Sequence, residues 1–173
     1  MTDPEIDALA TEVLVACRAR KLMVATAESC TGGLVAAALT AIAGSSDVVD
    51  RGFVTYTNEA KQEMLGVSAD ILAAHGAVSP ETAEAMARGA LARSRAQVSV
   101  SITGIAGPGG ATPGKPVGLV QFGACSDDRL ILREHRFGAI GRAEVRRASV
   151  MVALGLLLEL AEPQAAGAAP GRP

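Results

Sequence analysis

The chain has 173 residues, of which 49% are hydrophobic and 20% are charged, and this composition is typical of one globular domain. The net charge of −2 and the 2% aromatic content argue against a nucleic-acid-binding surface, because such surfaces need clustered basic side chains and stacking rings. Three scattered cysteines and two histidines predict neither a disulfide framework nor a metal site.

The termini and the apolar runs predict a cytoplasmic address. The first twenty residues are an acidic amphipathic stretch and do not resemble a signal peptide. The longest apolar run, residues 151–158, is too short to cross a bilayer. We therefore expect no contact with a membrane.

Helical and strand patterns alternate in the first third of the chain. Asp3 before Pro4 is a typical helix start, and the Gly-Ser-Ser-Asp sequence that begins at Gly44 breaks a later helix. The predicted elements, in chain order, are a helix from Pro4 to about Cys17, a buried strand over residues 22–27, an Ala/Leu-rich helix that ends near residue 43, and a strand over residues 52–57.

The rest of the chain adds helices and then strands. Three helices are predicted first, beginning near Asn58, Ser68 and Ser79. They are followed by a strand over residues 98–103, a Gly/Pro-rich loop that continues to residue 116, an antiparallel strand pair over 117–124 and 130–137, and a helix over 142–160.

This order of elements predicts a single domain over residues 1–162. Its expected fold is α/β, a three-layer α/β/α sandwich with a mixed, mainly parallel sheet. Residues 163–173 are rich in Ala, Gly and Pro, and we expect them to form a disordered tail.

The turn after the first strand is a candidate ligand site. Gly32 and Gly33 allow the backbone to approach a ligand closely. Ser29 or Thr31 can cap the following helix, and free N–H groups at a helix start suit a phosphate or a carboxylate. A tight strand-to-helix turn with an ordinary cap explains the same residues equally well.

The loop after the third strand is a second candidate. Thr103 and Gly104 lie where that strand ends, at the same predicted edge of the sheet, and ligands of open α/β sheets bind beyond the carboxyl ends of strands. A long loop inside a compact domain is often functional, although it can also be a flexible connection. Lys115 in this loop could contact a phosphate or simply be solvated.

Ser46, Tyr56 and Lys61 are candidates for nucleophilic chemistry. A serine hydroxyl needs a neighbouring base, and a lysine can serve if burial lowers its pKa. Tyr56, the only tyrosine, could relay a proton. Each residue also has an ordinary structural explanation in a turn, a strand or a helix. Cys30 competes as nucleophile because it lies near a predicted helix start.

At these residues the chain resembles the C-terminal domain family of the competence-damage protein CinA, and within it the stand-alone nicotinamide mononucleotide amidohydrolases. The final helix, with Arg142 and the Val-Arg-Arg sequence at 145–147, is also similar. The matching segments are residues 26–33 (TAESCTGG), 42–46 (IAGSS), 51–56 (RGFVTY), 58–61 (NEAK), 75–79 (HGAVS), 102–108 (ITGIAGP) and 115–118 (KPVG).

The resemblance implies hydrolysis of the carboxamide of nicotinamide mononucleotide to nicotinate mononucleotide and ammonia, in pyridine nucleotide recycling. It implies Ser46 as nucleophile, Lys61 as base and Tyr56 beside them. It also implies Ser29, Thr103 and Arg142 at the same site. With the residues of the two glycine-rich segments added, the expected substrate-binding set is Ser29, Thr31, Gly32, Gly33, Thr103, Gly104 and Arg142.

The resemblance implies neither a metal nor an organic cofactor, and the expected partner is the small nucleotide substrate. A homodimer is compatible with the Ala-rich helices, as is a monomer. Two other functions stay open at this point: a non-catalytic nucleotide-binding module, and a Ser/Lys amidase or esterase that acts on another small substrate.

Overall fold

The computed structural model describes residues 3–163, and its centre is a five-stranded sheet in the order β2-β1-β3-β4-β5. β1 pairs in parallel with β2 and β3, whereas β4 pairs antiparallel with β3 and β5. Four strands therefore run in one direction and only β4 opposes them. The strands are β1 (Val24–Glu28), β2 (Val49–Val54), β3 (Val98–Gly104), β4 (Leu119–Cys125) and β5 (Leu130–Arg136).

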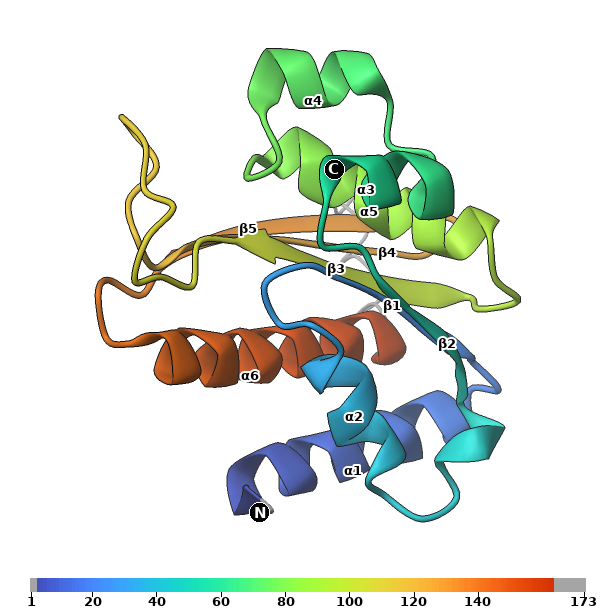
Figure 1. The fold of residues 1–173 in the computed structure, drawn as a ribbon. Coiled ribbons are helices and arrows are strands. Elements are labelled where there is room, and N and C mark those ends of the chain that lie inside the picture. The colour runs from blue at the N-terminus through green and yellow to red at the C-terminus, as the bar shows by residue number, and fades with distance from the viewer. Residues whose placement is uncertain (1–2, 164–173) are drawn as a thin grey trace, which may run out of the picture.

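Helices cover both faces of the sheet, so the predicted three-layer α/β/α sandwich with a mixed sheet is confirmed (Figure 1). One layer holds α1, α2 and α6, and the other holds α3, α4 and α5. The helices are α1 (Pro4–Ala19), α2 (Leu34–Thr40), α3 (Asn58–Leu65), α4 (Ala69–His75), α5 (Pro80–Ala92) and α6 (Arg142–Ala161), and a short 3-10 turn, η1 (Ser45–Asp47), precedes β2.

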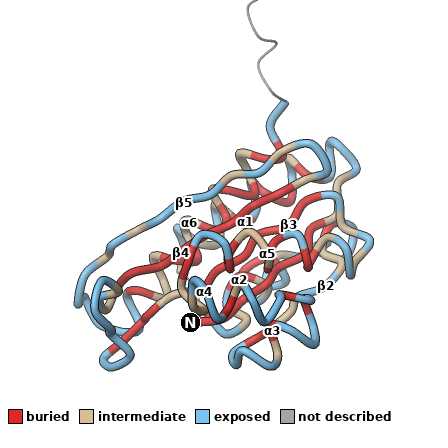
Figure 2. Tube along the Cα trace, turned by 90° about the horizontal axis from the view of Figure 1, so that it is seen from above, coloured by how far each residue is buried: buried red, intermediate tan, exposed pale blue. Residues whose placement is uncertain are grey.

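Burial explains why the hydrophobic pattern of the sequence predicts the central strands. β1 and β4 are buried at every residue, as expected for strands that are covered on both faces. Figure 2 shows the buried residues along the central strands β3 and β4 and the exposed residues along the edge strand β5. None of the helices within residues 3–163 combines the length and the apolar character needed to cross a bilayer.

The largest difference from the predicted elements is β2, which begins at Val49 rather than at residue 52. Its ladder with β1 starts where Val24 pairs with Val49. Asp50 and Arg51 thus lie in a strand although both are charged. The Arg51 side chain is partly exposed on this edge strand, whereas the Asp50 carboxylate is only 2% exposed and is paired with arginines. A hydrophobic pattern cannot detect such residues.

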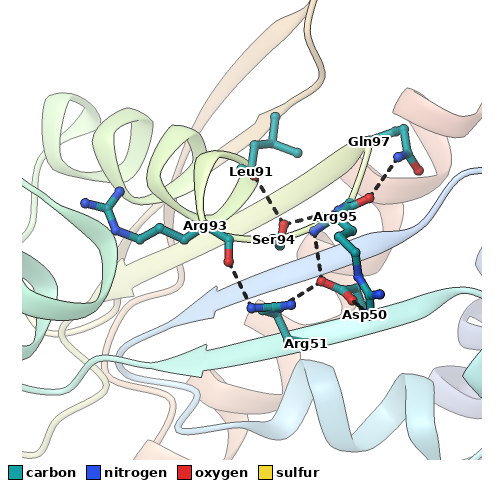
Figure 3. A network of polar contacts seen from close by, with 8 residues as sticks. Asp50, Arg51, Leu91, Arg93, Ser94, Arg95 and Gln97 are labelled. Carbon is teal, nitrogen blue, oxygen red and sulfur yellow. Dashed lines mark hydrogen bonds and ion pairs between the residues drawn. The ribbon is translucent and has the colours of Figure 1, made fainter.

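Asp50 joins this edge strand to the loop between α5 and β3 (Figure 3). Its carboxylate accepts hydrogen bonds from Arg51 Nε at 2.8 Å and from the backbone N–H of Arg95 at 3.0 Å. Arg51 Nη1 in turn donates to the carbonyl oxygen of Arg93 at 3.0 Å. This network connects the start of β2 to the loop before β3. It lies at the amino-terminal ends of β1, β2 and β3, opposite to their carboxyl ends.

At the other end of β1, the buried carboxylate of Glu28 forms the N-terminal cap of α2. It accepts hydrogen bonds from the backbone N–H groups of Gly33, Val35 and Ala36 at 2.9–3.1 Å. A carboxylate at a helix start is favoured by the free N–H groups and by the helix dipole. The expectation that Ser29 or Thr31 caps α2 is therefore wrong, because Glu28 reaches these groups from the preceding strand.

The predicted tail, residues 163–173, lies outside the described residues except for residue 163. Its expected disorder stays a prediction. The same holds for the expectation that residues 1–162 fold as a single unit.

The Glu28 cap predicts a large loss of stability on substitution. Glu28→Gln places an amide N–H₂ against the donors of α2, so the free energy of unfolding should fall by about 2–4 kcal/mol. Glu63→Gln is the matched control, since Glu63 is exposed on α3, and it should change stability by less than about 0.5 kcal/mol. Urea unfolding of both variants gives the two values. Equal stability of both variants would contradict this role of Glu28.

Candidate active site

Three parallel strands end at the same edge of the sheet and bring the candidate residues together. Ser29 follows β1, Tyr56 follows β2, and Thr103 is the penultimate residue of β3. A cleft of about 250 Å³ opens there. Its lining includes Ser29, Cys30, Tyr56, Lys61, Ala77, Val78, Thr103, Gly104, Arg142 and residues of the loop from Ile105 to Gly110.

The central contact of the cleft is between Lys61 and Ser29. Lys61 Nζ lies 3.0 Å from Ser29 Oγ and 2.7 Å from the carbonyl oxygen of Thr55. The lysine side chain projects from α3 into the protein and is only 1% exposed. Ser29 is held in place by its backbone N–H, which donates to the carbonyl oxygen of Ile102 in β3. The structure therefore presents a serine hydroxyl and a buried amine in direct contact.

Burial changes the proton affinity of this amine. Loss of solvent around the ammonium lowers the pKa of Lys61 from 10.5 to about 8, and the nearby Cys30 thiol opposes this only in part. No carboxylate is among the causes of the shift, so the charged form has little to offset its desolvation. At a pKa of about 8, an appreciable fraction of the amine is neutral near physiological pH and can accept a proton.

Ser46 does not join this site, and within one chain the structure does not bring it to Lys61. Ser46 is exposed in η1, which lies beside the start of β1 because Val24 N–H donates to Val48 O at 2.7 Å. Ser29 follows the other end of β1, about 16 Å away at 3.3 Å per residue. The serine of the first glycine-rich turn, expected only to bind substrate, is the one that contacts the lysine.

Cys30 lines the cleft but is not an activated nucleophile. Burial raises the pKa of its thiol to about 11, and the side chain is 6% exposed. The thiolate is the reactive form of cysteine, so this thiol stays protonated at neutral pH. Cys30 is therefore a small buried residue in a close-packed turn, the common structural role of a free cysteine.

Tyr56 and Arg142 form the outer part of the cleft. Arg142 Nη2 donates to the Tyr56 hydroxyl at 2.6 Å, and Arg142 Nη1 donates to Gly107 O at 3.0 Å. Arg142 thus connects the end of β2 with the loop after β3. The Tyr56 side chain is 56% exposed, and within residues 3–163 its hydroxyl bonds to Arg142 rather than to Ser29 or Lys61.

The first glycine-rich turn lacks the free helix N-terminus that was expected to bind an anion. Gly33 N–H donates to Glu28, and Gly32 N–H donates to Ser29 O at 3.0 Å. The N-terminal groups of α2 are therefore occupied by a carboxylate of the protein itself. Thr31, Gly32 and Gly33 also do not line the cleft. The start of α2 is therefore not an open anion site, and the expected role of these three residues in substrate binding stays a prediction.

The residues at the end of β3 shape the opposite wall. Thr103 Oγ1 donates to Ala77 O at 2.7 Å and so fixes the segment between α4 and α5 against the sheet. Gly104 is required for close strand packing, since a Cβ there would lie 2.8 Å from Leu119 O in β4. Lys115 Nζ donates to His75 O at 2.6 Å, at the C-terminal end of α4.

Some contributors were not predicted. Glu28 and Arg146 hold the Ser29 turn from two sides, and Ala77 and Val78 line the cleft. All four lie in segments that carry the family resemblance. The contact of Arg146 joins segments that are 116 residues apart, whereas the contacts of Glu28 are with residues five to eight positions later. For residues 3–163, no group of three or more His, Cys, Asp or Glu side chains is placed to hold a metal ion.

Comparison with known proteins agrees with this architecture. The family model for the CinA C-terminal domain matches residues 6–161. The crystal structure of the competence/damage inducible protein CihA from Agrobacterium tumefaciens superposes with a TM-score of 0.92 at 53% identity, covering 94% of this chain and 99% of that one.

Two curated relatives differ in how much of their length the chain covers. Nicotinamide-nucleotide amidohydrolase PncC of Escherichia coli K12 is 50% identical over 158 residues, which cover 91% of this chain and 95% of the relative. A CinA-like protein of Mycolicibacterium gilvum is 55% identical over 135 residues, which cover 78% of this chain but 32% of the relative. The chain thus spans about a third of the longer CinA-like relatives and nearly all of the shorter amidohydrolase. On the sequence match and the shared fold, this protein belongs to the CinA C-terminal domain family.

Proposed function

We propose that this protein hydrolyses the carboxamide of nicotinamide mononucleotide to nicotinate mononucleotide and ammonia, with Ser29 as nucleophile and Lys61 as general base. The observation that carries the proposal is the 3.0 Å contact between Ser29 Oγ and the buried Lys61 Nζ. The choice of substrate draws on the similarity to the E. coli amidohydrolase, which the chain matches along almost the whole length.

In the first half of the reaction, neutral Lys61 accepts the hydroxyl proton of Ser29 while Ser29 Oγ attacks the carboxamide carbon. The carbonyl oxygen of Thr55 accepts a hydrogen bond from Lys61 Nζ at 2.7 Å and so directs the lone pair of the amine toward Ser29. The tetrahedral intermediate collapses when protonated Lys61 gives its proton to the leaving nitrogen. Ammonia departs, and the acyl group stays on Ser29 as an ester.

In the second half, water attacks the ester carbon. Lys61, neutral again, removes a proton from this water, and then returns it to Ser29 Oγ as the ester bond breaks. The products are the free carboxylate and the original hydroxyl, so the enzyme is regenerated. One buried amine thus serves as base and as acid in both halves, which requires a pKa near the operating pH.

The substrate phosphate is proposed to bind away from α2. The Glu28 carboxylate occupies the N–H groups at the start of that helix, and a second anion there would be repelled. Arg142, at the outer rim of the cleft beside Gly107, offers a guanidinium for a charge-assisted contact. Binding in this direction places the nucleotide phosphate at the rim and the carboxamide at Ser29.

The proposed nucleophile is tested by three alanine variants. Ser29→Ala and Lys61→Ala should each lower kcat for ammonia release from nicotinamide mononucleotide by more than about a thousandfold, since each removes a member of one catalytic unit. Ser46→Ala is the matched control and should keep the parent rate. Loss of activity in Ser46→Ala with Ser29→Ala still active would reverse the assignment. A folded parent that binds the nucleotide without turnover would indicate a binding module instead.

The pH dependence tests the base. Because neutral Lys61 is the reactive form and burial lowers its pKa to about 8, kcat/KM should rise with pH between 7 and 9 and then level off. At pH 7 only about a tenth of the enzyme carries the neutral amine. Initial rates measured from pH 7 to 10 give the profile. A rate that is constant or that falls across this range would contradict the role of Lys61.

A further inference from the structure

The backbone of the turn after β1 is held by the charged side chains of Glu28 and Arg146 and not by the hydroxyl of Thr31. Thr31 Oγ1 is buried and has no hydrogen-bond partner among the described residues. Glu28 binds N–H groups on the α2 side of the turn. On the other side, Arg146 from α6 donates from Nε to Cys30 O at 3.1 Å and from Nη2 to Thr31 O at 2.9 Å.

These two contacts of Arg146 fix the orientation of two successive peptide groups. In a trans peptide the C=O and the following N–H point in opposite directions. Since Cys30 O and Thr31 O both face the guanidinium, the N–H groups of Thr31 and Gly32 face away from it. Gly32 N–H indeed donates to Ser29 O at 3.0 Å, on the Ser29 side of the turn.

The Thr31 N–H is directed toward the same side but has no acceptor among residues 3–163. The N–H of Cys30, the residue directly after Ser29, has no backbone acceptor there and is met only by its own sulfur atom. Backbone N–H groups that follow a nucleophile at a strand-to-helix turn commonly stabilise the oxyanion in acyl transfer. The unpaired Thr31 N–H is therefore available for the negative charge that develops on the carboxamide oxygen, beside the Cys30 N–H.

We infer that Arg146 is a positioning residue for the reaction: by holding the carbonyl groups of Cys30 and Thr31, it aims the Thr31 N–H at the oxyanion. This inference rests on the proposed function. Arg146 does not line the cleft and acts through the backbone, whereas Arg142, one helical turn earlier on the same face of α6, lines the rim of the cleft itself.

The chain offers a matched control on the same helix. Arg147 forms ion pairs with Asp3 and Glu5 near the start of α1, away from the Ser29 turn. Arg146→Ala and Arg147→Ala each remove one guanidinium from α6 that bonds to another segment. Only Arg146→Ala removes a contact with the turn. A general loss of helix packing or of positive charge would lower kcat in both variants, whereas loss of the turn contact lowers kcat in Arg146→Ala alone.

The experiment measures kcat and KM for nicotinamide mononucleotide in the parent, Arg146→Ala, Arg146→Lys and Arg147→Ala, with thermal unfolding of each. We expect Arg146→Ala to lower kcat about 10- to 100-fold, somewhat less than the removal of an oxyanion donor, with KM changed less than about twofold because the oxyanion forms only in the transition state. Arg146→Lys, which cannot hold two carbonyl groups in the same fork geometry, should recover only part of the rate. Arg147→Ala should keep the parent kcat.

Two results would overturn the inference: a parent-like kcat in Arg146→Ala, with or without a rise in KM, or an equal loss of kcat in Arg147→Ala. If Arg146→Ala does not fold, Arg146→Lys decides, and a parent-like kcat in that variant overturns the inference. An inactive parent, in contrast, contradicts the proposed function and not the role of Arg146. The two failures are thus distinguishable in one set of assays.

Discussion

The site depends on one contact, the buried hydrogen bond between Lys61 and Ser29. The Lys61 amine is 1% exposed, and no carboxylate contributes to its pKa. Its charged form is therefore costly to keep in the protein interior. The fold therefore holds a lysine whose neutral form is accessible near neutral pH, and it places a serine hydroxyl at hydrogen-bond distance. The parallel pairing of β1 with β2 and β3 makes this possible, because the chain segments that carry Ser29, Lys61 and Thr103 all leave the sheet at one edge.

The turn that carries Ser29 shows how a polar segment can be rigid inside a buried region. Its N–H groups toward α2 bond to Glu28, and its carbonyl groups toward α6 bond to Arg146. Both charged groups are thereby paired with backbone dipoles, which lowers the cost of their burial. The same arrangement keeps the start of α2 occupied and leaves the Thr31 N–H beside Ser29 without an acceptor among residues 3–163.

Most of the fold follows from the sequence, because periodic burial leaves a clear pattern. The central strands and the long helices were predicted within a few residues, whereas β2 was displaced because Asp50 and Arg51 lie in an exposed edge strand. The site was harder to predict. Lys61, Tyr56, Thr103 and Arg142 are correctly brought to one cleft, but Ser46 is at the other end of β1. The predicted order of elements already places Ser46 before the second strand and Lys61 after it, so the pairing of the two rested on the family resemblance and not on this order. The caps formed by Glu28 and the clamp formed by Arg146 connect positions up to 116 residues apart, and no local pattern encodes them.

The most direct test of this account is to locate the acyl group on the enzyme during turnover. The parent protein is mixed with nicotinamide mononucleotide, quenched in acid within the first turnovers, digested, and analysed by mass spectrometry with fragmentation of the peptide that contains both Ser29 and Ser46. The account predicts an acyl ester on Ser29, and none in the Ser29→Ala variant. An acyl group on Ser46 or on Cys30 would contradict it.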